Sequence, residues 1–114
     1  MRIKNTTKKT LLAKDAKPCK SIFSRTRGLM FSKPRPLIFV FEKEKIIPLH
    51  MLFVFYPIDA LFLDKNKIVV EIKENFMPFT LYSPKKKSKY ILELPKDIIR
   101  ETKAGIGDKI EFLK

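Results

Sequence analysis

Short apolar runs separated by breaks dominate the middle of the chain. Leu37–Phe41 is a continuous apolar run of the kind found in a strand buried on both faces. Leu49–Phe55 predicts a second buried strand, and the charged segment Glu42–Lys45 predicts the turn between them. Pro57 breaks this second run, and Ala60–Leu63 resumes it as a further strand.

The next segments alternate between apolar and polar residues instead. Ile68–Lys73 alternates, so it predicts a half-buried strand. The intervening Asp64–Lys67 has turn composition, which makes Ala60–Leu63 and Ile68–Lys73 a β-hairpin. Tyr90–Leu94 also alternates, and Lys109–Leu113 predicts the last strand.

The two ends of the chain predict shorter elements. Ile3–Asn5 and Thr10–Ala13 form two short strands around a polar turn. Pro18–Arg27 forms a short helix, and a second short helix follows Pro95, since proline suits the first helical turn.

Together these patterns predict a mainly β (α+β) fold of about six to eight short strands with one or two short helices. Closing such short apolar strands into a single compact β-barrel removes exposed strand edges, so we expect a barrel. The length fits a single domain over residues 1–114, with residues 1–9 as a flexible basic segment or an edge strand.

Positive charge is concentrated at the start of the chain. The net charge is +13, and residues 1–36 hold eleven of the 25 Lys and Arg residues but one of the 12 acidic residues. Such a basic segment attracts polyanions, namely nucleic acid, anionic lipid or an acidic protein, although the charge can also serve solubility alone. The candidate polyanion-binding residues are Arg25, Arg27, Lys33, Arg35, Lys85, Lys86 and Lys87.

Neither an export signal nor a membrane span is predicted. No apolar run of about 7–15 residues follows the basic N-terminus, so we expect a cytoplasmic protein. Residues 46–63 contain no Lys or Arg. Pro57 and Asp59 nevertheless disfavour a membrane-spanning helix there, and the aromatic and β-branched residues favour strands.

No catalytic set is recognisable. His50 is the one histidine and Cys19 the one cysteine, so a Cys–His dyad needs both, and no intrachain disulfide forms. Metal sites usually need three or four ligands, and the chain has no glycine-rich nucleotide loop. We therefore predict no catalytic residue, metal or cofactor, and we favour a non-enzymatic protein. We also expect a monomer.

Two aspartates stand out by position. Asp59 lies in an apolar segment, and two interpretations are open. In the first, it lines a cleft and serves as an acid, a base or a ligand. In the second, it accepts hydrogen bonds from backbone N–H groups that the break at Pro57 leaves free. We favour the second interpretation. Asp108 follows Gly107 and predicts a tight turn held by its carboxylate. The candidate ligand or cleft residues are Arg27, His50, Asp59, Tyr82 and Ser83.

Several segments resemble one family in the same order along about residues 10–113. They are Arg27–Phe31, Leu37–Phe41, His50–Met51, Pro57–Asp64, Pro78, Tyr82–Pro84, Tyr90–Leu94 and Gly107–Ile110. The chain resembles the domain of unknown function 192 family, also called uncharacterised protein family 0127, as an archaeal-type cytoplasmic member. The resemblance implies a compact β-barrel but no activity. The family usually has a Met-Lys-Asn-Thr-like stretch where this chain has Met51–Val54, so the polar Lys, Asn and Thr are absent here. If those residues bind a ligand in relatives, the resemblance does not imply that role for this chain.

Three hypotheses on function follow. The leading one is a non-enzymatic binding or accessory module. The second is binding of nucleic acid or another polyanion through the basic N-terminal third. The third is a small enzyme or ligand carrier with a cleft near His50 and Asp59.

Overall fold

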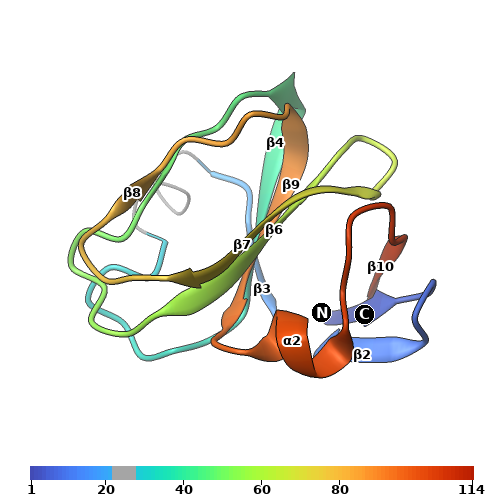
Figure 1. Ribbon diagram of the computed structural model, residues 1–114, viewed down its shortest axis with the longest axis horizontal. Helices are drawn as coiled ribbons and strands as arrows, with labels where there is room; N and C mark the ends of the chain where they lie inside the picture. Colours follow the sequence, from blue (N-terminus) through green and yellow to red (C-terminus); the bar gives the residue numbers. More distant parts are fainter. Residues whose placement is uncertain (22–27) are drawn as a thin grey trace.

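A five-stranded sheet forms the centre of the computed structural model, which describes residues 1–21 and 28–114 (Figure 1). The strand order is β3-β4-β9-β6-β7, and β3 pairs parallel to β4 while the other neighbours are antiparallel. The strands are β3 (Lys17–Cys19), β4 (Leu37–Lys45), β6 (Ile58–Leu63), β7 (Val69–Phe76) and β9 (Ser88–Pro95).

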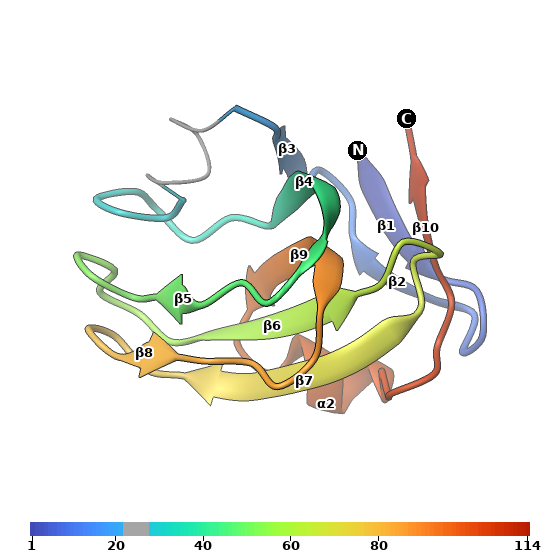
Figure 2. The same ribbon diagram turned by 90° about the horizontal axis from the view of Figure 1, so that it is seen from above.

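Two smaller sheets and a helix surround this centre (Figure 2). A three-stranded sheet joins the two ends of the chain in the order β10-β1-β2. A two-stranded sheet pairs β5 with β8. The elements are β1 (Arg2–Asn5), β2 (Thr10–Ala13), β5 (Leu49–His50), β8 (Leu81–Tyr82), α2 (Ile98–Thr102) and β10 (Ile110–Leu113).

Strand β6 is buried along its whole length because both faces of the central sheet are covered. Its alternating side chains enter two separate cores. The first core lies toward β1, β2, β10 and α2 and takes Leu61 and Leu63. The second core lies on the other face and takes Ile58, Ala60 and Phe62.

The prediction of a single closed β-barrel is wrong. The described residues form a compact, mainly β fold with one short helix, in which the three sheets are open. The reason lies in strands such as β4 and β9, which send apolar side chains into both cores. A sheet that is apolar on both faces needs a covering layer on each side, and closure into a small barrel would leave one face to solvent.

Most predicted strands are confirmed, including both N-terminal strands and the hairpin of β6 and β7. Residues 1–9 do not form a flexible segment or an edge strand, because β1 is the middle strand of its sheet. The chain ends therefore support each other through β1 and β10.

Two local predictions fail, and a third is covered only in part by the described residues. The expected turn Glu42–Lys45 continues β4 instead. The expected strand Leu49–Phe55 ends at His50, because the Met51 backbone binds the opposite loop rather than a neighbouring strand. The expected helix Pro18–Arg27 begins as β3, while residues 22–27 lie outside the described residues.

Candidate functional site

Three loop segments meet at one end of the molecule: residues 28–36 before β4, the loop between β5 and β6, and the loop between β7 and β8 (left in Figure 2). The Phe31 N–H donates to the Phe53 carbonyl at 2.9 Å, which joins the first two loops. The Met51 N–H donates to the Thr80 carbonyl at 2.8 Å, and the Phe79 N–H donates to the Met51 carbonyl at 2.8 Å. These bonds fix the loops relative to one another, so their tips form one surface.

Four phenylalanine rings lie on this surface in solvent. Phe31 and Phe55 are each 65% exposed, Phe79 is 49% and Phe53 is 44% exposed. The rings touch in sequence: Phe31 stacks on Phe53 with centroids 4.8 Å apart, and Phe79 meets Phe53 and Phe55 edge-on at 5.9 and 5.4 Å. We call these four residues the phenylalanine surface. Contiguous exposed apolar patches of this kind mark interaction sites.

Three of the four residues also adopt a strained backbone conformation. The φ angles of Phe31, Phe53 and Phe79 are 56°, 57° and 59°. A bulky non-glycine residue in this left-handed region is a genuine outlier and costs on the order of 1–3 kcal/mol. Such strain clusters at functional surfaces, so it supports a binding role for this end of the molecule.

The charge around the phenylalanine surface has one sign. The segments 28–36, 46–57 and 75–83 contain Lys33 and Arg35 but no Asp or Glu. Lys33 is exposed and Arg35 is half-buried. The candidates Arg25 and Arg27 lie outside the described residues.

The lysine turn after β8 is held by Glu71. The backbone N–H groups of Lys85 and Lys86 each donate to Glu71 Oε1 at 2.9 Å. The Tyr82 hydroxyl donates to Glu71 Oε2, and this hydrogen bond raises the pKa of Tyr82 to about 12. Ser83 is exposed. The side chains of Lys85, Lys86 and Lys87 therefore remain free to face solvent from a fixed turn.

Asp59 is a structural acceptor that ties three elements together. Its Oδ1 accepts the Asn75 N–H at 3.0 Å and its Oδ2 accepts the Ile99 N–H at 3.0 Å. The prediction that Asp59 accepts backbone N–H bonds is confirmed. The donors come from β7 and α2 rather than from the turn at Pro57, because strand alternation turns Asp59 toward the helix side of β6.

The structure does not bring His50 to Asp59. The His50 Nδ1 accepts the Leu52 N–H at 3.2 Å within its own loop, and β5 packs on the second core through Leu49. Asp59 points to the opposite face of the central sheet, toward Ile99. The prediction of one cleft near His50 and Asp59 is therefore wrong, since a central sheet separates the two groups.

The other chemically reactive groups are buried. The Cys19 thiol donates to the Lys17 carbonyl at 3.8 Å, and burial raises its pKa, so it stays protonated at neutral pH. Burial also raises the pKa of Glu93 to about 8. Sequence reasoning missed Glu93, although an acid between Leu92 and Leu94 in an apolar strand was a signal. No group of three or more His, Cys, Asp and Glu within the described ranges could hold a metal ion.

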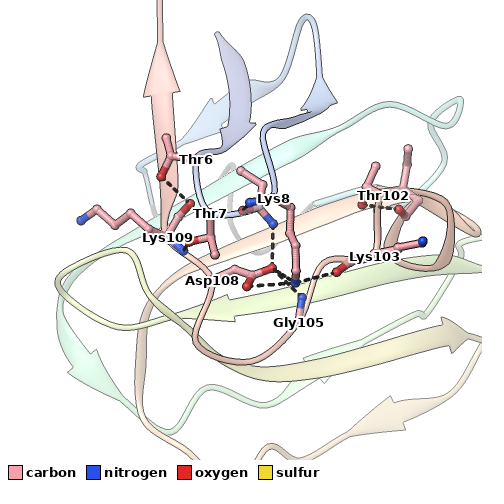
Figure 3. Close-up of polar contacts among 10 residues, drawn as sticks. Thr6, Thr7, Lys8, Thr102, Lys103, Gly105, Asp108 and Lys109 are labelled. Carbon is pink, nitrogen blue, oxygen red and sulfur yellow. Dashed lines mark hydrogen bonds and ion pairs between the residues drawn. The ribbon is translucent and has the colours of Figure 1, made fainter.

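Asp108 joins the two ends of the chain (Figure 3). Its Oδ2 accepts the Asn5 Nδ2 at 2.8 Å, the Gly105 N–H at 2.8 Å and the Lys8 Nζ at 2.9 Å. We call these four residues the Asp108 cluster. Burial acts to raise the pKa of Asp108, but the hydrogen bonds from Asn5, Lys8 and Gly105 and the Lys8 charge together lower it. The bond to its own turn was predicted, while the partners Asn5 and Lys8 were missed.

Within the described part of the chain, no helix has the length and apolar content needed to cross a bilayer.

Comparison with known proteins identifies the fold and the family. A solved Novosphingobium aromaticivorans protein of unknown function has a TM-score of 0.85 at 19% identity, covering 97% of this chain and 82% of its own. A Sinorhizobium meliloti 1021 protein with the provisional name of transcription regulator has a TM-score of 0.86 at 20% identity, covering 96% and 89%. At this identity, the likeness shows the fold alone.

Archaeal relatives are more similar in sequence. A UPF0127 protein of Pyrococcus furiosus is 41% identical over 95 residues, 81% of each chain. A UPF0127 protein of Thermococcus sibiricus is 35% identical over 112 residues, covering 95% of this chain and 72% of its own. The model of the uncharacterised family DUF192, described as "Uncharacterized ACR", matches residues 3–112. The chain belongs to the DUF192 (UPF0127) family, whose function is uncharacterised.

Proposed function

We propose that this chain is a non-enzymatic binding module that attaches to an anionic lipid surface through the phenylalanine surface. The observation that carries the proposal is the contiguous set of exposed rings on loops whose only charged side chains are cationic. Aromatic side chains enter the interfacial region of a bilayer, and lysines beside them bind anionic headgroups. The anionic leaflet faces the cytoplasm, which fits the expected location.

The magnitudes fit reversible attachment. Full burial of a Phe side chain contributes roughly 1.5–3 kcal/mol, so a ring that is about half exposed contributes roughly 1 kcal/mol on leaving water. Each cation near an anionic surface contributes about 1 kcal/mol. Four rings with Lys33 therefore reach roughly the strength of a single lipid anchor, which holds a protein only reversibly.

Charge and ring geometry favour lipid over the alternatives. A second copy would bring two cationic rims together on chains that each carry +13, and such like-charge contact is unfavourable. Single-stranded nucleic acid needs free aromatic faces for stacking, whereas Phe31 and Phe53 already stack on each other. A fluid bilayer accepts a ring cluster of any detailed shape.

Vesicle co-sedimentation tests the proposal. Wild-type protein should bind vesicles of mixed phosphatidylcholine and phosphatidylserine, and bind pure phosphatidylcholine much more weakly. The triple variant F31N/F53N/F79N should lose about a hundredfold of the affinity, since three rings at roughly 1 kcal/mol each are removed. The variant K85Q/K86Q/K87Q should weaken binding and reduce its dependence on salt.

A matched control uses another exposed apolar residue. Ile106 is 70% exposed in the turn before β10, so Ile106→Asn should leave vesicle binding unchanged. Equal binding by wild type and the triple variant would overturn the proposal. So would absence of vesicle binding together with tight, salt-dependent binding of RNA or duplex DNA, which would favour the nucleic-acid hypothesis.

A further inference from the structure

Lysines gather at one end of the central sheet, where β4 ends, β6 turns into β7 and β9 begins (upper part of Figure 1). These segments are neighbours, because Lys45 of β4 and Leu63 of β6 both lie opposite the first residues of β9. The segments 42–45, 64–67 and 85–89 hold eight of the 25 Lys and Arg residues against three of the 12 acidic residues. We call these three segments the lysine end. The phenylalanine surface precedes β6 and therefore lies at the other end of that strand.

The acids near the lysine end hold backbone turns in place and do not neutralise the lysines. Glu44 Oε2 accepts the Lys65 N–H at 2.7 Å, which ties the end of β4 to the turn between β6 and β7. Asp64 Oδ1 accepts two N–H groups of its own turn at 2.8 and 3.0 Å, and Glu71 holds the lysine turn in the same way. Among the described residues, no ion pair involves a lysine of this end. The charges are therefore presented to solvent from fixed turns.

Two of these lysines converge on one ring. The Nζ atoms of Lys67 and Lys89 lie 5.7 and 5.5 Å from the centroid of Tyr90. The same ring packs edge-on against Phe112, with centroids 5.5 Å apart. Ammonium groups that approach one ring repel each other, and neither has a carboxylate partner in the described part of the chain. An anion that contacts both of them relieves this repulsion.

We propose that the lysine end binds the phosphate backbone of double-stranded nucleic acid without reading its sequence. A duplex carries one phosphate charge per about 1.7 Å of its axis, so it offers contacts to several turns of this end at once. The three segments contain no arginine, and lysine acts as a point charge rather than as a bidentate fork. Phosphate contacts of this kind position a protein on a duplex but carry no sequence information. This binding goes beyond the proposed lipid attachment and does not depend on the phenylalanine surface.

The composition of the lysine end favours a duplex over other polyanions. Single strands bind by stacking their bases on free aromatic faces, whereas the Tyr90 ring already contacts two lysines and Phe112. A bilayer takes up apolar side chains beside the cations. The three segments, all of them described, expose no large apolar side chain, although Ile46 follows the first one directly. Protein interfaces are depleted in lysine and draw their binding energy from aromatic and arginine anchors, which this end does not present.

Fluorescence anisotropy of short labelled duplexes tests the proposal, with the full chain titrated in at salt concentrations between about 50 and about 200 mM. Wild type should bind duplexes of unrelated sequence equally well, and the logarithm of the affinity should fall linearly with the logarithm of the salt concentration. Single strands of the same sequences should bind more weakly. Similar affinities for duplex DNA and duplex RNA would support contact with the phosphates alone. A preference for one of them would identify the duplex whose groove dimensions fit the turns.

Two matched triple variants separate the lysine end from net charge. K43Q/K65Q/K87Q removes one exposed lysine from each segment. Each lost phosphate contact lowers the salt slope by about 0.9, so this variant should lower it by about 2.7 and the affinity at about 100 mM salt by about 500-fold. K14Q/K17Q/K96Q removes the same charge from exposed lysines near the start of β4 and the end of β9, at the opposite ends of these strands. It should keep the wild-type slope.

Four results would contradict the proposal. The first is no binding of either duplex at about 50 mM salt. The second is an equal loss of affinity in the two lysine variants, because the attraction would then follow net charge. The third is tighter binding of single strands or of polyglutamate than of duplex. The fourth is loss of duplex binding in F31N/F53N/F79N, which should bind duplex like wild type even where it loses vesicle binding, so the two proposals fail separately.

Discussion

The Asp108 cluster and the phenylalanine surface are both assembled from distant parts of the chain, but their side chains lie in opposite kinds of environment. The Asp108 cluster buries polar groups, and each carboxylate oxygen has a donor. The phenylalanine surface leaves apolar rings in solvent and holds three of them at strained φ angles. The first arrangement lowers the free energy of the folded chain, and the second raises it.

This difference separates residues that hold the fold from residues that serve a partner. A cluster that stabilises the fold needs no ligand to explain it. Exposed, strained rings contribute little to folding, so an interaction is the better explanation of their presence. We therefore expect substitutions in the Asp108 cluster to lower stability strongly and substitutions in the phenylalanine surface to change it little.

The largest loss is expected for Asp108→Ala. This change leaves buried Asn5 and the Gly105 N–H without an acceptor and Lys8 without its ion pair. Breaking a partly buried charge network of this kind costs roughly 3–5 kcal/mol, or more than about 10 °C in melting temperature. Thermal denaturation followed by circular dichroism measures it. Glu111→Ala, at an exposed acid of β10, is the control, and an equal loss in both variants would mean that the Asp108 cluster does not stabilise the fold.

The Asp108 cluster should also make the folded chain sensitive to acid. The pKa of Asp108 is lowered in the folded chain, so its stabilising effect is present above the ordinary aspartate pKa of about 3.9 and is lost as pH falls below it. Denaturant unfolding of wild type between about pH 5 and pH 2 should show this loss. In Asp108→Asn the loss over that range should be smaller, because the group no longer titrates.

The next loss is expected for Asp59→Ala. Its carboxylate holds the N–H groups of Asn75 and Ile99, and stranding such buried groups costs about 1–3 kcal/mol each. We expect a total of roughly 2–4 kcal/mol. Asp64→Ala should do less, since the N–H groups of Asn66 and Ile68 that Asp64 accepts lie in a turn that water can reach. Equal melting temperatures of the two variants would contradict this ranking.

Glu93 should give an effect of opposite sign. Burial raises the pKa of Glu93 to about 8, so its neutral form is favoured in the fold and stability is lost as pH rises from about 4.3 toward 8. Glu93→Gln removes this loss and should stabilise the chain by roughly 3–4 kcal/mol at pH 7. Unfolding of both proteins at pH 5 and pH 8 measures it, and a difference that does not grow with pH would contradict it.

The smallest effect is expected for the phenylalanine surface itself. Asn tolerates the left-handed conformation better than Phe, so F31N/F53N/F79N should change stability by less than about 1 kcal/mol and can even raise it. Phe62→Ala, at a fully buried ring, should cost about 3–5 kcal/mol. If the triple variant melts as low as Phe62→Ala, the rings hold the fold and the comparison fails.

The sequence by itself determined the local elements. Alternating and continuous apolar runs predict β4, β6, β7 and β9, since the period of two along a strand is a local property. Likewise Gly107 and Asp108 predict their own turn, and Gly107 has a φ of 94°. The apolar segment around Asp59 also indicated an acid that must find donors.

The tertiary structure decided which distant residues meet. The bond between Asn5 and Asp108 spans 103 residues, and that between Asp59 and Ile99 spans 40. No local pattern encodes such partners, because they depend on the order of strands across the sheets. The open sheets also depend on tertiary structure, because a central sheet with apolar side chains on both faces needs a covering layer on each side. The loops that connect these layers end at one place, and this brings Phe31, Phe53 and Phe79 together.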